Sequence, residues 1–248
     1  MSETNVSVNA ELRDVAEEVA EQQLAAAARG QIGPFCKACP TCDGRACAGV
    51  MPGPGDKGVG RVAHRNWEAW QDVRVSMDTL HESWAADTRT AVLGRELALP
   101  VMIGPVGDVQ RHYGEKYDTG SYNRRVLEAA EGEGTLAWTG DGLDASIMAE
   151  ACSLIAELGG AGVPTVKPWD LATLEEKFAL VKESGAFAAA MDIDAAGLPF
   201  LKGLTPPAGS KTVEELRQIA KMAGTPFIVK GVMTVKGALK AKEAEASA

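Results

Sequence analysis

Four of the five cysteines lie close together in the chain: Cys36, Cys39, Cys42 and Cys47. Their spacing is C-x2-C-x2-C-x4-C, and thiolates at this density can bind Zn²⁺ or an iron–sulfur cluster. The first three match the opening of a bacterial ferredoxin motif, whereas the last spacing does not. One contiguous loop rarely supplies a tetrahedral zinc site without two knuckles. The four cysteines therefore either bind a metal or cluster, or serve as redox-active or as reduced structural thiols.

A second group of polar residues follows short apolar segments: Thr139 with Asp141, Thr165 with Lys167, Asp192 with Asp194, and Lys230. Hydroxyl groups and a cation in such places suit ligand binding. The carboxylates could orient a neighbour or accept a proton. Two neighbouring carboxylates could also serve glycoside-type chemistry, but the sequence does not fix their separation.

The elements that must position these residues alternate regularly. Apolar segments predict strands over residues 99–107, 135–142, 162–169, 186–194 and 226–234. Helices are predicted over residues 121–133, 144–158, 171–184 and 211–223, with a last one from near Val235. Continuous apolar strands alternating with helices indicate a parallel α/β fold, whose sites lie at the carboxyl ends of the strands. No G-x-G-x-x-G motif follows the first strand, so a (β/α)8 TIM-barrel type fits better than a dinucleotide-binding fold.

The number of repeating units raises a question about the barrel. Five strand–helix units of roughly 30 residues each fill the region from residue 99 onward. A closed barrel of this type has eight such units. We therefore expect a fragment, a chain that needs a partner, or a different architecture.

The N-terminal part has another character. Residues 9–29 predict a helix, and residues 30–66, rich in Gly, Pro and Cys, predict an irregular loop. Residues 67–80 are expected to be irregular, with apolar anchors at Trp67, Trp70, Val73, Val75, Met77 and Leu80. Two domains follow: residues 1–98 (helix, Cys-rich loop and lead-in segment) and residues 99–248 (partial barrel).

Composition narrows the class of protein. The chain has 248 residues with 46% hydrophobic residues and a net charge of -9, which argues against a disordered or nucleic-acid-binding chain. No apolar run is long enough to span a membrane, and the first residues do not form a secretory signal. The three histidines form no H-E-x-x-H motif. We expect a cytoplasmic protein.

Several segments carry a resemblance to a known family. NWEAWQDVRVSMDTL, DTRTAVLGRELALPVMIGPVG, AMDIDAAGLP and PFIVKGVMT are similar to segments of the FMN-dependent α-hydroxy-acid oxidases and dehydrogenases, such as lactate and glycolate oxidases. The resemblance runs from about residue 30 to the end. It implies a (β/α)8 barrel with FMN across the carboxyl ends of the strands, and oxidation of a small α-hydroxy acid to a 2-oxo acid by hydride transfer to flavin.

The resemblance also implies residue roles. The backbone of Pro105, Val106 and Gly107 would approach the flavin, Thr139 and Thr165 would hydrogen-bond to it, and Lys230 would stabilise negative charge on its reduced form. An ordinary salt bridge is the alternative for Lys230.

The sequence also departs from the family pattern. Lys167 stands where many relatives carry a substrate-side Tyr, and Asp192 where many carry a Thr. Asp194 matches a family position and is a candidate catalytic residue. His112 follows the first predicted strand, so it is either a substrate contact or a surface histidine.

The family's catalytic His and substrate-binding Arg follow the sixth strand, beyond residue 248, so activity of this chain alone is not expected. The alternatives are another FMN barrel, such as type 2 isopentenyl-diphosphate isomerase, and a non-catalytic metal-binding partial barrel. Expected partners are a small α-hydroxy acid and either further copies of the chain or a complementary C-terminal chain. Neither nucleic acid nor a membrane is expected as a partner.

Overall fold

The computed structural model describes residues 23–24, 26–33, 35–50, 60–82, 84–198, 201 and 203–248. The chain divides into two compact units. Unit 1 comprises residues 1–79 and 110–117, and unit 2 comprises residues 80–109 and 118–248. The domain boundary expected after residue 98 lies inside unit 2 by this division. The helix expected over residues 9–29 lies mostly outside the described residues, although residues 23–24 and 26–28 are helical.

Unit 2 is built on a parallel sheet with the strand order β3-β4-β5-β6. The strands are β3 (Trp138–Thr139), β4 (Val163–Val166), β5 (Ala189–Asp192) and β6 (Phe227–Lys230). Each lies within an apolar segment that predicted a strand. The register pairs Asp192 with Lys230, so these two side chains lie opposite each other at the carboxyl ends of β5 and β6.

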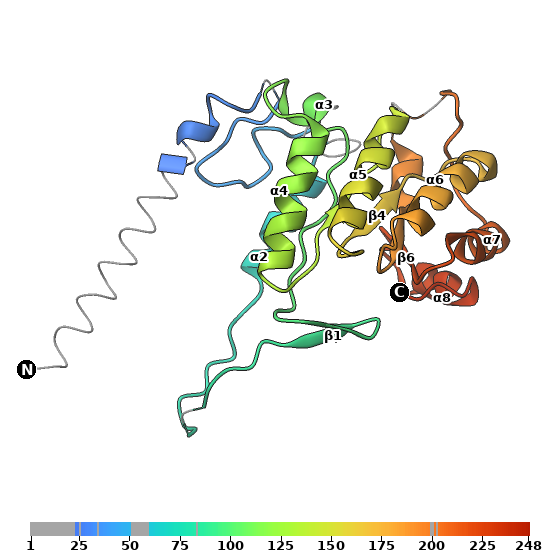
Figure 1. Ribbon diagram of the computed structural model, residues 1–248. Coiled ribbons are helices and arrows are strands. Elements are labelled where there is room, and N and C mark those ends of the chain that lie inside the picture. The colour runs from blue at the N-terminus through green and yellow to red at the C-terminus, as the bar shows by residue number, and fades with distance from the viewer. Residues whose placement is uncertain are drawn as a thin grey trace, which may run out of the picture. The chain divides into compact units, whose positions relative to one another are not determined.

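Five helices alternate with these strands: α4 (Thr119–Gly132), α5 (Ala145–Glu157), α6 (Leu171–Glu183), α7 (Val213–Ala223) and α8 (Val235–Glu243). Each packs against the next, along one face of the sheet (Figure 1). A side chain accepts a hydrogen bond from the first turn of every one of them; the capping residues are Asp118, Asp144, Asp170, Thr212 and Thr234. Such caps fix where each helix begins after its strand.

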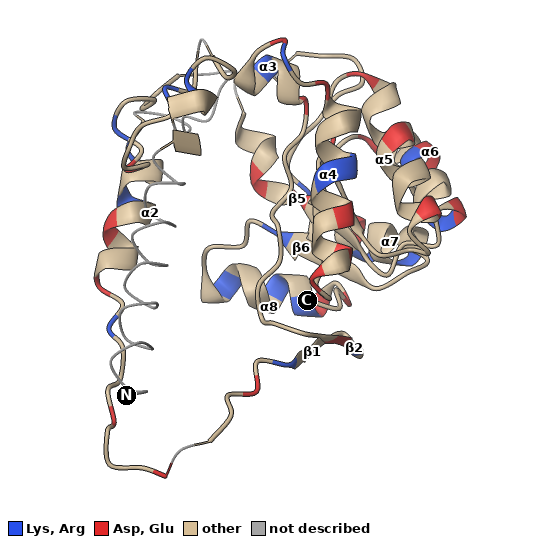
Figure 2. Ribbon diagram, turned by 60° about the vertical axis from the view of Figure 1, so that its left-hand side comes forward, with Lys and Arg blue, Asp and Glu red and all other residues tan. Residues whose placement is uncertain are grey.

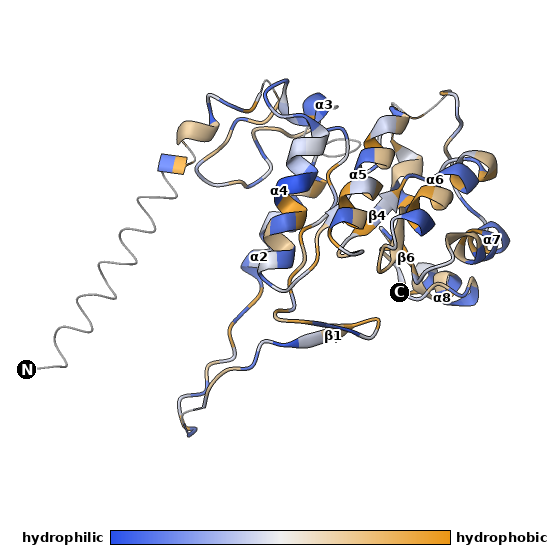
Figure 3. Ribbon diagram, viewed as in Figure 1, coloured by the Kyte–Doolittle hydropathy of each residue, from blue (hydrophilic) through white to orange (hydrophobic). Residues whose placement is uncertain are grey.

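The main core lies between the sheet and these helices. Its largest fully buried members include Phe178, Phe227, Met191 and Ile219. Figure 3 shows hydrophobic residues on the side of α6 that faces the strands, and Figure 2 shows charged residues on the outer sides of α5 and α6. Burial of this apolar stripe is the main source of helix stability, because isolated helices of this length are marginal in water.

A smaller cluster covers the other face of the sheet. Val163, Ala188, Ala190 and Ile228 pack there with Leu93, Trp138 and Phe187. Leu93 belongs to the tip of an antiparallel hairpin formed by β1 (Thr90–Val92) and β2 (Arg95–Leu97). The guanidinium of Arg95 lies over the ring of Phe187, 5.6 Å from its centroid. The hairpin therefore covers the amino-terminal part of the sheet.

Three sequence expectations need correction. The segment 99–107 was expected to form a strand, but only Ile103 pairs, in one isolated bridge to Ala137. The irregular stretch expected through residue 80 contains the helix α2 (Val62–Gln71), and the β1–β2 hairpin was not predicted. The expected apolar anchors Trp70, Val73, Val75, Met77 and Leu80 are exposed, with at least 63% of each accessible to solvent. Short elements and exposed apolar residues both lack the buried periodic pattern on which such predictions depend.

Candidate functional site

Two buried threonine hydroxyls mark the carboxyl ends of adjacent strands. Thr139 ends β3 and Thr165 lies in β4, and both residues are almost fully buried. Neither Oγ1 atom has a hydrogen-bond partner among the described residues. A buried hydroxyl without a partner is costly, and such groups usually receive one from water or a ligand. Both residues were predicted to bind the cofactor, and both hydroxyls are available for it.

The backbone at residues 105–107 runs close to the end of β3. A Cβ atom on Gly107 would collide with the backbone carbonyl of Asp141, and a Cβ atom on Gly140 would collide with the backbone of Gly107. Only glycine permits backbones to approach this closely. Pro105 and Val106 precede this contact and are half-buried. The structure thus brings the predicted 105–107 segment beside Thr139.

Lys230 forms a charged cluster with two aspartates. Its Nζ atom lies 2.6 Å from Oδ1 of Asp192 and 4.0 Å from Oδ1 of Asp194. Burial raises the pKa of Asp192, and a hydrogen bond with Asp194 adds to this effect, while the Lys230 ammonium opposes it. The direct partner of Lys230 is Asp192, and Asp194 lies farther away and is exposed. Lys230 therefore combines a salt bridge with a position at the end of its strand.

A buried carboxylate holds the ends of β3 and β4 together. Oδ2 of Asp141 accepts hydrogen bonds from the Lys167 backbone amide (3.0 Å) and from Nε1 of Trp169 (2.6 Å). Its Oδ1 accepts from the Gly142 amide (2.9 Å) and lies 2.8 Å from Nζ of Lys177. The Asp141 side chain is 1% exposed. Charge-assisted bonds of this kind are strong, and here they fix the loops that follow Thr139 and Thr165.

Sequence reasoning missed the role of Asp141 and Lys177, although a signal was available. Lys177 occupies the apolar stripe of α6 with Leu174, Phe178 and Val181, and a lysine on a buried helix face needs a paired anion. The ammonium also lies 5.8 Å from the centroid of the Trp169 ring. No pattern in the sequence identifies Asp141 as the anion.

The two predicted substrate contacts lie in different units. Lys167 is half-buried beside β4 in unit 2, and its backbone amide is held by Asp141. His112 is half-buried in α3 (Val109–Tyr113), within the part of that helix that belongs to unit 1.

The four clustered cysteines belong to unit 1 and form no disulfide. Burial raises the pKa of the Cys47 thiol, and the neighbouring thiols of Cys42, Cys36 and Cys39 add electrostatic repulsion. In the described parts of the chain, no three His, Cys, Asp or Glu side chains converge on a point that would hold a single metal ion.

A comparison with known protein families matches part of the chain to one family. Residues 54–147 match the model of the FMN-dependent dehydrogenase family. The resemblance inferred from the sequence is thereby confirmed. No curated protein sequence gives a significant match to the chain.

Several solved structures share the fold of this chain. A lactate oxidase from Pediococcus acidilactici superposes with a TM-score of 0.62 at 19% identity, over 91% of this chain and 63% of its own. A flavocytochrome b2 variant gives 0.60 at 16% identity, over 79% and 51%. A soluble mutant of the membrane-associated (S)-mandelate dehydrogenase from Pseudomonas putida gives 0.63 at 13% identity, over 91% and 68%.

The chain therefore has the fold of part of a (β/α)8 barrel, and it spans 63% of the length of the lactate oxidase. The sheet β3–β6 with its covering helices supplies consecutive units of that barrel. No helix in the described residues has the length and apolar character needed to cross a membrane.

Proposed function

We propose that the protein is an FMN-dependent oxidoreductase that converts a small α-hydroxy acid into a 2-oxo acid. The observation that carries this proposal is the pair of buried, unpartnered hydroxyls of Thr139 and Thr165 at the carboxyl ends of adjacent strands. The match to the FMN-dependent dehydrogenase family supports the choice of cofactor. In parallel α/β barrels, this end of the strands is where ligands bind.

The residues at this edge fit FMN. The hydroxyls of Thr139 and Thr165 would each gain the hydrogen bond that they lack, and the backbone of Pro105, Val106 and Gly107 would approach the same group. FMN, when bound, accepts a hydride from the carbon that carries the hydroxyl group. Lys230 supplies a positive charge at the end of β6, which favours negative charge nearby.

The remaining assignments extend this proposal. Asp192 orients the Lys230 ammonium through its 2.6 Å contact. Asp194, 4.0 Å from the same ammonium, is proposed to orient it or to accept a proton. Lys167 and His112 are proposed substrate contacts, and a lysine at position 167 favours a substrate that carries a carboxylate.

FMN binding by the purified chain tests the cofactor assignment. Thr139→Val and Thr165→Val remove the unpartnered hydroxyls, and each should raise the dissociation constant of FMN about 2- to 10-fold. Thr225→Val is the matched control. Its hydroxyl already donates to backbone carbonyls of Ala186 and Phe187 at 3.2 Å, so FMN affinity should not change. Equal affinity in all four proteins would contradict the assignment.

Anaerobic addition of substrates tests the reaction. Lactate, glycolate and mandelate are each mixed with the FMN-loaded protein, and the flavin absorbance is followed. Bleaching by any of them supports the proposed chemistry. Because residues 1–248 lack the family's catalytic His and substrate-binding Arg, bleaching is not expected of this chain alone, and bleaching would overturn that expectation. Turnover of isopentenyl diphosphate instead would contradict the proposed reaction and favour the isomerase alternative.

We also propose a homo-oligomer or a complementary chain as the macromolecular partner. Apolar side chains at the start of α8 support this, since Met233 is 88% and Val235 80% exposed. Light scattering coupled to gel filtration measures the oligomeric state, and a monomer without an added partner chain would oppose the homo-oligomer. The five free cysteines support a reducing compartment, for which we propose the cytoplasm.

A further inference from the structure

All four clustered cysteines of unit 1 line one cavity. The cavity has a volume of about 330 Å³, and Ala38, Gly44, Ala46 and Ala63 complete much of its wall. The fifth cysteine, Cys152, is buried in α5 of unit 2. Lys37, Asp43 and Asn66 complete the lining, so four thiols and several small side chains share one cavity.

The backbone of the cysteine loop (residues 35–50) is shaped to turn around this cavity. Ala38 has a φ of 45° and Gly44 a φ of 75°, so the chain turns in the left-handed region near two of the cysteines. The Ala38 amide points to Sγ of Cys36 at 3.5 Å. An amide that donates to sulfur stabilises the thiolate form, and such bonds are a regular feature around metal-bound cysteines.

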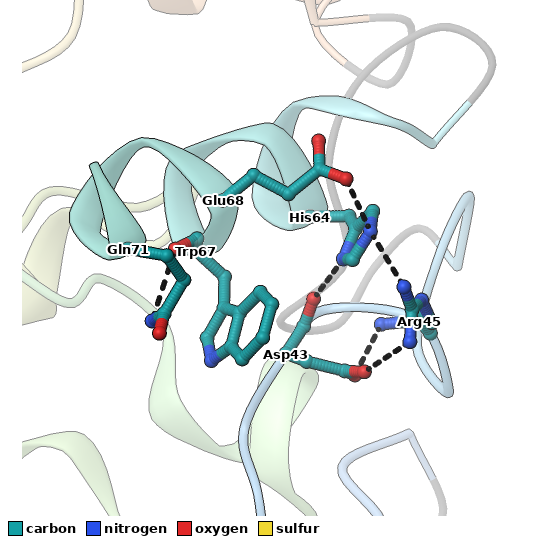
Figure 4. A network of polar contacts seen from close by, with 6 residues as sticks. All are labelled: Asp43, Arg45, His64, Trp67, Glu68 and Gln71. Carbon is teal, nitrogen blue, oxygen red and sulfur yellow. Dashed lines mark hydrogen bonds and ion pairs between the residues drawn. The ribbon is translucent and has the colours of Figure 1, made fainter.

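Helix α2 holds the cysteine loop in place through a polar network (Figure 4). Nδ1 of His64 lies 2.8 Å from the Asp43 carbonyl oxygen, and its Nε2 lies 3.1 Å from both Arg45 and Glu68. Arg45 in turn contacts the Asp43 carboxylate at 3.3 Å. This network fixes the segment between Cys42 and Cys47, where the sequence spacing departs from the ferredoxin motif.

The arrangement of the ligands separates two kinds of metal centre. A tetrahedral zinc ion draws four sulfur atoms to about 3.8 Å from one another, because each Zn–S bond is about 2.3 Å. The described residues offer no such convergence. A cluster holds its thiolates farther apart, because iron and sulfide ions lie between them, and it needs a cavity of its own.

We propose that Cys36, Cys39, Cys42 and Cys47 bind a [4Fe–4S] cluster in the cavity of unit 1. Two ferrous and two ferric ions with four sulfides give a core of charge 2+, so assembly from this mixture needs no further oxidant. Each thiol releases one proton to solvent when its sulfur binds iron. The proposal does not depend on the flavin site of unit 2.

Anaerobic reconstitution of the full chain tests the site. The chain is mixed with equal amounts of ferrous and ferric iron and with sulfide, desalted, and analysed for iron and acid-labile sulfide. We expect about four of each per chain, and a visible absorption that dithionite bleaches. Flavin is quantified separately after acid release, so its presence does not affect the result.

Cysteine variants identify the ligands. Cys39→Ser and Cys42→Ser should each lose most of the iron and sulfide, whereas Cys152→Ser, the matched control, should retain both. Equal cluster content in all three variants would overturn the proposal. So would stoichiometric zinc, or iron without sulfide, in the parent chain.

Protection of thiols from alkylation tests the same site without a substitution. Iodoacetamide should modify the four clustered cysteines of the metal-free chain, and cluster loading should protect them. If the loaded chain is alkylated at these positions as fast as the metal-free chain, the cluster is not bound there.

Discussion

The cysteine loop of unit 1 and the parallel sheet of unit 2 are fixed by different forces. In unit 2, β4, β5 and β6 are almost fully buried, and helices with side-chain caps at their N-termini cover them. In unit 1, α2 has no buried residue, and the loop depends on contacts among Asp43, Arg45, His64 and Glu68. A buried apolar core tolerates exchange of one apolar side chain for another of similar size. A partly exposed polar network needs particular side chains in particular places.

The largest loss of stability is expected when the buried ion pair of unit 2, Asp141 with Lys177, is broken. Asp141→Ala leaves the Lys177 ammonium without its anion, and removing one partner of a buried pair costs about 3–5 kcal/mol. Urea unfolding followed by circular dichroism measures this. Glu157→Ala, which removes the exposed partner of Arg124, is the control and should leave the midpoint nearly unchanged. Similar midpoints for both variants would mean that Asp141 does not organise the sheet edge.

A smaller effect is expected in unit 1. His64→Ala removes the link between α2 and the Asp43 carbonyl and should weaken the loop by about 1 kcal/mol. Hydrogen exchange of residues 35–50 should become faster, while exchange in β4–β6 should stay the same. The control is His81→Ala, since His81 contacts Trp84 and the Glu82 carbonyl in unit 2. Faster exchange in both units after His64→Ala would show that their stabilities are not separable.

The pH dependence of unit 2 should carry a signature of Asp192. Its pKa is raised in the folded chain by burial, so the folded state binds this proton more tightly than the unfolded state. The resulting stabilisation is complete below the unfolded pKa and is lost as the pH rises through the raised folded pKa. Unfolding free energies measured across this range should fall with rising pH, and Asp192→Asn should flatten that part of the curve. If the pH dependence of the unfolding free energy is the same in the variant, it arises from other groups.

Mild alkylation, which should disturb the structure least, compares the reactivity of the thiols of both units in one experiment. Burial raises the pKa of Cys152 to about 12, so its thiolate is scarce near neutral pH. Cys42 is exposed and should react quickly, and Cys47 should react more slowly, because its pKa is also raised. Peptide mass spectrometry at several times gives the order. Modification of Cys152 before Cys42 in the native chain would contradict the burial of α5.

The sequence by itself located the strands β3–β6 and the helices α4–α8 of unit 2, but not the β1–β2 hairpin of the same unit. Apolar segments such as 226–234 contain the strands, and residues such as Asp170 and Thr212 begin the helices, because burial and capping are local and periodic. It also determined the carboxyl-edge positions of Thr139, Thr165 and Lys230, since in a parallel sheet all strands end on one side. Helix α2 was missed; its apolar residues at helical spacing, Ala63, Trp67 and Trp70, were interpreted as part of irregular segments, and the helix buries no residue.

Tertiary structure decided which of these side chains meet. Asp141 and Lys177 are distant in sequence, and only the packing of α6 against β4 brings them to 2.8 Å. The register between β5 and β6 places Asp192, rather than Asp194, directly opposite Lys230. The cavity between the four cysteines likewise depends on His64, which belongs to another element and holds the loop from outside. Contacts of this kind depend on how distant parts of the chain pack together, which no local sequence pattern encodes.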